Sequence, residues 1–159
     1  MVRGMRRLQS ECRHPGRMLT ELVKTHPLMA SDVLLVLVRD PARTQRIEHV
    51  TRLERQDWAT IDQDDMSDVI YREVNAMPIP AWDKKGPKHT LVTIVARHGF
   101  TVLGPRETKW LIAWRYSNHL TNAYSGSLMI VTEHGWTDFM SGTGGATPRL
   151  EKPLRLVGA

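Results

Sequence analysis

The residues best suited to chemistry lie in two short stretches, Gly104–Glu107 and Thr132–Trp136. Residues 100–132 have the pattern of a strand, a helix and a second strand, and such a unit normally places its two strands parallel in one sheet. Ligands of parallel sheets gather beyond the carboxyl ends of the strands, so we expect both stretches at one edge. The predicted residues of this edge are Arg106, Glu107, Glu133, His134 and Asp138.

Carboxylates and an imidazole at one edge could hold a divalent metal ion, which could activate water for hydrolysis. This hypothesis makes Glu107, Glu133 and His134 catalytic, and it makes Glu133, His134 and Asp138 the metal ligands. Arg106 and the N-terminus of the following helix would bind an anionic group. The alternative is that the carboxylates are solvated and that His134 bonds within a loop, because the sequence has no paired metal-ligand spacing.

Two further groups could contact a ligand. Arg115 and His119 share one face of a helix, and they could bind a nucleic-acid phosphate or a partner. Alternatively, these cationic side chains interact favourably with the C-terminus of their helix. Trp136 lies in an expected loop, where it could stack on a base or anchor a partner, or else close the edge of the core.

Two other motifs resemble ligand-binding loops but are better explained by roles in folding. Residues 62–68 with Glu73 partly match a calcium-binding loop, but Met66 and Ser67 occupy its fifth and sixth positions. An acidic cap on the following helix explains these carboxylates. The glycine-rich residues 141–145 lack the Gly-Lys-Ser/Thr ending of a phosphate-binding loop, so we interpret them as a plain loop.

Composition indicates a single soluble domain. The chain has 159 residues, of which 41% are hydrophobic and 25% are charged, as in ordinary globular proteins. Cys12 is its single cysteine, so no internal disulfide can form, and we expect a cytoplasmic protein. No apolar run approaches the roughly 18 residues that a membrane-spanning helix needs.

The positive charge is concentrated at the N-terminus. Residues 1–17 carry five arginines and one glutamate, so most of the net charge of +5 lies there and the rest is nearly neutral. Such an arm could contact the phosphates of a nucleic acid. It could also be a disordered leader, and Met18 is an alternative start of the protein.

We expect a globular domain over 18–140, between this leader and an extended Gly- and Pro-containing tail over 141–159. Apolar periodicity predicts helices over 18–26, 64–76 and 105–119 and strands over 33–38, 90–96, 100–103 and 127–132. Residues 44–53 fit either a strand, paired back on residues 33–38, or a helix, and we favour the strand. The predicted fold is α/β, bordering on α+β, with a mixed sheet of four or five strands and about three helices.

Three functions remain open at this stage. The first is a non-catalytic binding or accessory module, acting near nucleic acid through residues 1–17. The second is a metal-dependent hydrolase or nuclease, with a divalent metal as its cofactor. The third is a structural subunit of a larger assembly, which implies oligomers. We place the binding module first, because each candidate catalytic group also has a structural explanation.

Overall fold

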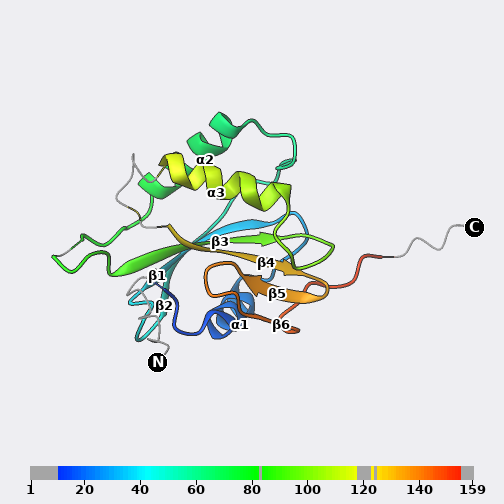
Figure 1. Cartoon of the computed structure of the whole chain (residues 1–159), viewed down its shortest axis with the longest axis horizontal. Coiled ribbons are helices and arrows are strands. Elements are labelled where there is room, and N and C mark those ends of the chain that lie inside the picture. The colour runs from blue at the N-terminus through cyan, green and yellow to red at the C-terminus, as the bar shows by residue number, and fades with distance from the viewer. Residues whose placement is uncertain (1–10, 83, 118–122, 124, 155–159) are drawn as a thin grey trace, which may run out of the picture.

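The computed structural model describes residues 11–82, 84–117, 123 and 125–154. A six-stranded mixed sheet is covered by helices on both faces (Figure 1). The helices are α1 (Pro15–Thr25), α2 (Gln63–Asn75) and α3 (Pro105–Ser117). The strands are β1 (Val33–Arg39), β2 (Arg46–Arg52), β3 (His89–Ala96), β4 (Ser125–Thr132), β5 (Gly135–Asp138) and β6 (Gly144–Gly145).

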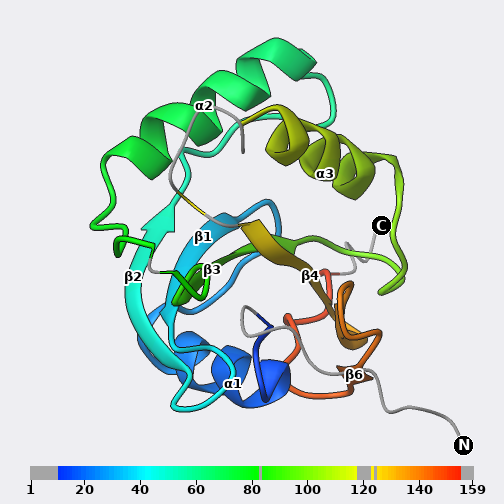
Figure 2. The ribbon, with the colours of Figure 1, turned by 60° about the vertical axis from the view of Figure 1, so that its left-hand side comes forward.

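The sheet has the order β2-β1-β3-β4-β5-β6, and β3 and β4 are its parallel pair. Helices α2 and α3 lie on one face of this sheet, and α1 lies on the other (Figure 2). Strand β1 is apolar from Val33 to Val38 because both of its faces are covered there. Leu35 and Leu37 pack in the core under α2 and α3, whereas Leu34 and Val36 pack in the core under α1.

Helices α2 and α3 form where the sequence predicts helices. The side chain of Asp62 caps α2 by accepting the N–H of Asp64 at 2.7 Å, as expected for an acidic cap. Helix α3 is buried through Trp110 and Trp114. The indole of Trp114 donates to the Thr93 hydroxyl at 2.6 Å, which fixes α3 over β3.

The predicted α/β class is confirmed, but the expected count of four or five strands is too low. Residues 46–52 form β2, which pairs with β1 as the favoured hairpin. The strand before α3 is β3, so the predicted unit over 100–132 is corrected to β3-α3-β4. Residues 100–103 form no strand, because the carbonyls of Phe100 and Val102 accept hydrogen bonds from Arg97 and not from a neighbouring strand.

The ends of the domain differ from the expected boundaries. Helix α1 already begins at Pro15, inside the expected leader, and the N–H of Arg13 donates to the carbonyl of Pro41 at 2.8 Å. The expected nucleic-acid contact through residues 1–17 falls largely on residues 1–10, which lie outside the described residues. Within the described part of the chain, no helix is both long and apolar enough to cross a membrane.

The chain beyond Asp138 packs against the sheet. Strand β6 pairs with β5, and the N–H of Leu150 donates to the carbonyl of Thr132 at 2.9 Å. Leu150 is buried in the core beneath α1. This segment therefore belongs to the domain as far as Leu150, where an extended tail was expected from its glycines and prolines.

Candidate binding surface at the carboxyl ends of β3 and β4

Two loops lie side by side where the parallel strands end. The first spans residues 98–104 between β3 and α3, and the second is the turn at Glu133 and His134 between β4 and β5. The two carboxylate oxygens of Glu133 accept the N–H of Gly99 at 3.1 and 3.0 Å. The imidazole of His98 lies 3.3 Å from the same carboxylate. The structure thus brings these two loops together at one edge of the sheet.

Arg97 holds the first loop from within. Its Nε donates to Glu107, and its Nη2 donates to the carbonyl of Val102 at 2.8 Å. Its Nη1 donates to the carbonyl of Phe100 at 2.9 Å and to that of His98 at 3.3 Å. We call this pair of side chains, Arg97 and Glu107, the brace, because it fixes the loop along its whole length.

Glu107 closes the brace at the start of α3. Its side chain is fully buried, and its second oxygen accepts the N–H of Gly104 at 3.0 Å. A glutamate three residues after the N-cap commonly reaches back in this way to the N-cap N–H. Both oxygens of Glu107 are therefore engaged inside the protein, which gives this carboxylate a structural role in place of the expected catalytic one.

The braced loop leaves apolar side chains in water. Phe100 is 76% exposed, Val102 is 65% exposed and Leu103 is 40% exposed. The ring of Phe100 stacks on the imidazole of His134, with the centroids 5.9 Å apart and the planes at 17°. We call Phe100, Val102, Leu103 and His134 the loop patch. Contiguous exposed apolar side chains commonly mark a site of interaction.

Glu133 is held in its ionised form. Its pKa is lowered first by a hydrogen bond from its own backbone N–H, and further by the N–H of Gly99, by His98 and by the charge of His134. A carboxyl group whose pKa is lowered by folding stabilises the folded protein fully at a pH above the ordinary pKa of glutamate. This stabilisation is lost as the pH falls through the lowered pKa.

We therefore expect the contact between Glu133 and Gly99 to persist below pH about 4.3, the ordinary pKa of glutamate. In a pH titration followed by NMR, the amide of Gly99 should shift with a midpoint below that value. In Glu133→Gln this transition should be absent. A midpoint at or above the ordinary value would show that the carboxylate is not held as described.

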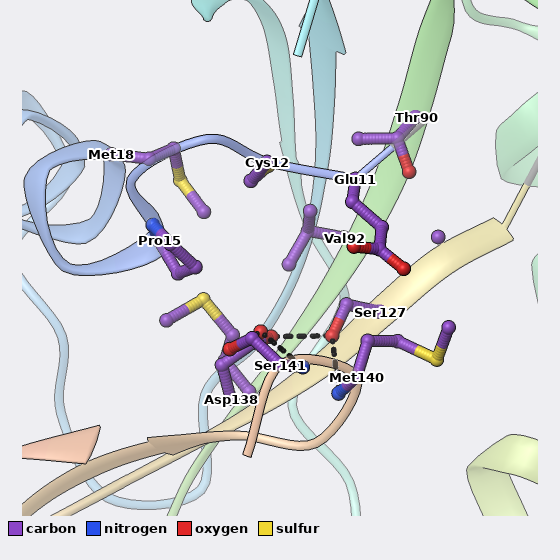
Figure 3. Close-up of a pocket in the computed structure, with 12 residues that line it drawn as sticks. Glu11, Cys12, Pro15, Met18, Thr90, Val92, Ser127, Asp138, Met140 and Ser141 are labelled. Atoms are coloured by element: carbon purple, nitrogen blue, oxygen red, sulfur yellow. Dashed lines mark hydrogen bonds between the residues drawn. The ribbon is translucent and has the colours of Figure 1, made fainter. Parts of the chain in front are cut away.

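Asp138 lies elsewhere, although it was expected beside Glu133 and His134. The hairpin between β4 and β5 turns at once, so the chain runs back along the sheet and Asp138 pairs with Met129. The buried Asp138 carboxylate accepts hydrogen bonds from the hydroxyls of Ser127 and Ser141 (Figure 3). The expected metal-binding set is therefore divided between two places, and no three described residues of suitable type form a metal site.

The pocket around Asp138 has room for little more than one water molecule, with a volume of about 10 Å³ (Figure 3). Cys12 lines it, and burial, followed by the charge of Asp138, raises the pKa of this thiol to about 12. The thiol therefore stays protonated at neutral pH and is a poor nucleophile.

The other predicted site residues are spread over the molecule. Arg106 is exposed at the start of α3, and Arg115 is exposed near its end. His119 lies outside the described residues. Trp136 is buried, and its indole donates to the carbonyl of Thr147 at 2.9 Å, so it closes the core and offers no exposed anchor.

The brace was not predicted from the sequence. Arg97 was assigned no role, and Phe100 to Leu103 were assigned to a strand, because their apolar character fits a strand as well as an exposed loop. An arginine at the end of a strand, followed by an apolar segment between Gly99 and Gly104, is the feature that could have suggested a braced loop.

Comparisons with known proteins give no match, whether the chain is compared with protein-family models, with curated proteins or with solved structures.

Proposed function

We propose that this protein is a non-catalytic binding module and that its loop patch contacts a partner protein. The observation that carries the proposal is the braced loop, in which a buried ion pair is used to hold exposed apolar side chains in one conformation. A contact surface that is already ordered loses less conformational entropy on binding than a mobile one. The exposed ring of Phe100 supplies the kind of aromatic anchor that dominates binding energies.

The carboxylates of this edge support binding more than catalysis. Glu107 is buried and pairs with Arg97, and Glu133 is engaged with Gly99 and His98. A general base needs an oxygen that can reach a substrate proton. Both carboxylates instead hold the loop in place, and we therefore do not advance the metal-dependent hydrolase.

The surroundings of the loop patch indicate the partner's chemistry. His134 is 59% exposed, and Arg106 is exposed two residues beyond the loop. The acids nearest in the chain are already engaged, Glu107 by Arg97 in the brace and Glu133 by the N–H of Gly99 in the turn. We therefore propose a partner surface with an apolar hollow bordered by carboxylates, since complementary charge favours encounter and orientation. A protein of this kind, with a single and only partly buried cysteine, suits the reducing cytoplasm.

A library of random peptides displayed on phage tests this proposal with the full chain as the target. The library is selected on the wild type and counter-selected on the double variant Phe100→Ser/Leu103→Ser. Tyr71→Ser, which alters an exposed aromatic residue on α2, is the matched control. We expect enriched peptides that combine aromatic or aliphatic residues with Asp or Glu, and that bind the wild type and the control but not the double variant.

Three results would overturn the proposal. Enriched peptides could bind the double variant as well as the wild type. The patch could instead bind vesicles containing anionic lipid, which would assign it to a membrane surface. The chain could self-associate through the patch, with the multimer lost in the double variant, which would favour a structural subunit.

A further inference from the structure

A separate cavity of about 350 Å³ lies at the same edge of the sheet, on the side of α2 and α3. It is bounded by the start of β1, the end of β3, residues 56–58 and the N-terminus of α3. Its volume falls at the lower end of the roughly 300–1,000 Å³ of known ligand pockets. Its position beyond the carboxyl end of a parallel strand, next to the crossover helix, is the usual one for ligands in such sheets.

Two tryptophans line this cavity: Trp58, which is 7% exposed, and Trp110, which is fully buried and packs against Trp58. The rings of Trp58 and Trp110 pack with their centroids 4.9 Å apart and their planes at 55°, and Val33 and Val95 line the cavity as well. Both indole N–H groups are buried, and neither has a hydrogen-bond partner among the described residues. Buried donors without partners cost free energy, so two of them on residues of one cavity call for an explanation.

Two opposite charges also line the cavity. Arg106 and Asp57 are both exposed, and within the described residues neither forms an ion pair, with each other or with a third group. Among the residues that the structure describes, the Asp57 carboxylate accepts only the nearby N–H of Ala59, at 3.1 Å. Flexible side chains of opposite charge that share a cavity without pairing can each bind one charge of a ligand that carries both.

We propose that this cavity binds a small aromatic zwitterion, such as a free aromatic amino acid. The aromatic group packs against the ring of Trp58, which itself rests on the buried Trp110, the carboxylate pairs with Arg106, and the ammonium group pairs with Asp57. Arg97 also lines the cavity, but the brace already engages its guanidinium, so Arg106 is the cation available to the ligand. This inference does not rest on the loop patch.

The test follows the indole N–H signals of the full chain by NMR as L-phenylalanine is added at up to millimolar concentrations. The signals of Trp58 and Trp110 should shift in a saturable way. Those of Trp114 and Trp136 should not, because their N–H groups already donate to Thr93 and Thr147. Two matched compounds, 3-phenylpropionate and 2-phenylethylamine, each lack one charge and should bind about tenfold or more weakly.

Variants separate the two charges. Arg106→Gln should weaken the binding of L-phenylalanine about tenfold and leave that of 2-phenylethylamine unchanged. Asp57→Asn should likewise weaken the binding of L-phenylalanine about tenfold, but it should leave that of 3-phenylpropionate unchanged. Arg115→Gln, near the other end of α3, should change neither. The proposal is overturned if the signals of Trp58 and Trp110 do not move, or if all three compounds bind equally, since the cavity would then recognise the aromatic ring alone. Phe100→Ser should leave these titrations unchanged, because Phe100 does not line the cavity. The proposals for the cavity and for the loop patch can therefore fail independently of each other.

Discussion

Arg97→Ala should lower the free energy of unfolding by about 3 kcal/mol or more. The substitution leaves the carboxylate of Glu107 fully buried without its cation, and a buried charge that loses its partner is strongly destabilising. It also removes the donors to the carbonyls of Phe100 and Val102. Urea denaturation of the two proteins should show a lower midpoint in the variant with an unchanged slope.

A double-mutant cycle supplies the control for this prediction. Arg97→Ala/Glu107→Ala removes both charges, so it should cost less than the sum of the two single substitutions. Arg97→Lys keeps the charge but loses the planar fork, and it should fall between the wild type and Arg97→Ala. Additive single effects, each below about 1 kcal/mol, would show that the pair does not hold the loop.

Gly135→Ala should destabilise the protein by about 3 kcal/mol. Gly135 has a φ of +129°, in a region that residues with a side chain rarely adopt, and this conformation alone costs about 1–3 kcal/mol for other residues. An added Cβ would also lie 2.0 Å from the carbonyl oxygen of Gly145 on β6. Because the three nearest atoms all belong to the backbone of Gly145 and Ala146, the clash is relieved only by moving the backbone. Thermal unfolding of the variant measures the loss.

Gly142→Ala is the matched control for this turn. Gly142 also has a positive φ, of +67°, but an added Cβ there meets no atom within 4 Å. It should therefore cost only the conformational part, about 1–2 kcal/mol. Equal effects of the two substitutions would mean that the contact between the turn and β6 is looser than described.

Much of the scaffold followed from local patterns. The apolar run at Val33–Val38 predicted a strand, and it forms most of β1, an interior strand between β2 and β3 that is buried on both faces. The stripe of Met66, Ile70 and Val74 predicted α2. These predictions succeeded because a buried face needs apolar residues at the period of its own element, which a single sequence displays.

The site was harder to predict because its contacts join residues that no local pattern links. The carboxyl ends of β3 and β4 do meet at one edge, but the hairpin after Thr132 turns within two residues and carries Asp138 away from it. The brace depends on a side chain, that of Arg97, that reaches the carbonyls of the loop that follows it. From its apolar residues alone, the loop over residues 100–103 was expected to be a strand.

The C-terminal segment shows the same limit. Its glycines suggested a loose tail, yet Gly144 and Gly145 form β6, where close backbone approach to Trp136 leaves no room for a side chain. A glycine in a strand often marks such an approach, but the sequence alone does not show which partner comes close.

The measurement that tests the loop patch most directly is the dissociation constant of a selected peptide for three full-length proteins, by calorimetry. Against the wild type, Phe100→Ala should weaken binding about thirtyfold, which is about 2 kcal/mol, because the ring is the exposed anchor of a fixed loop. Tyr71→Ala should leave the constant unchanged. If Phe100→Ala binds as tightly as the wild type, or if Tyr71→Ala weakens binding as much, the loop patch is not the surface through which this protein binds.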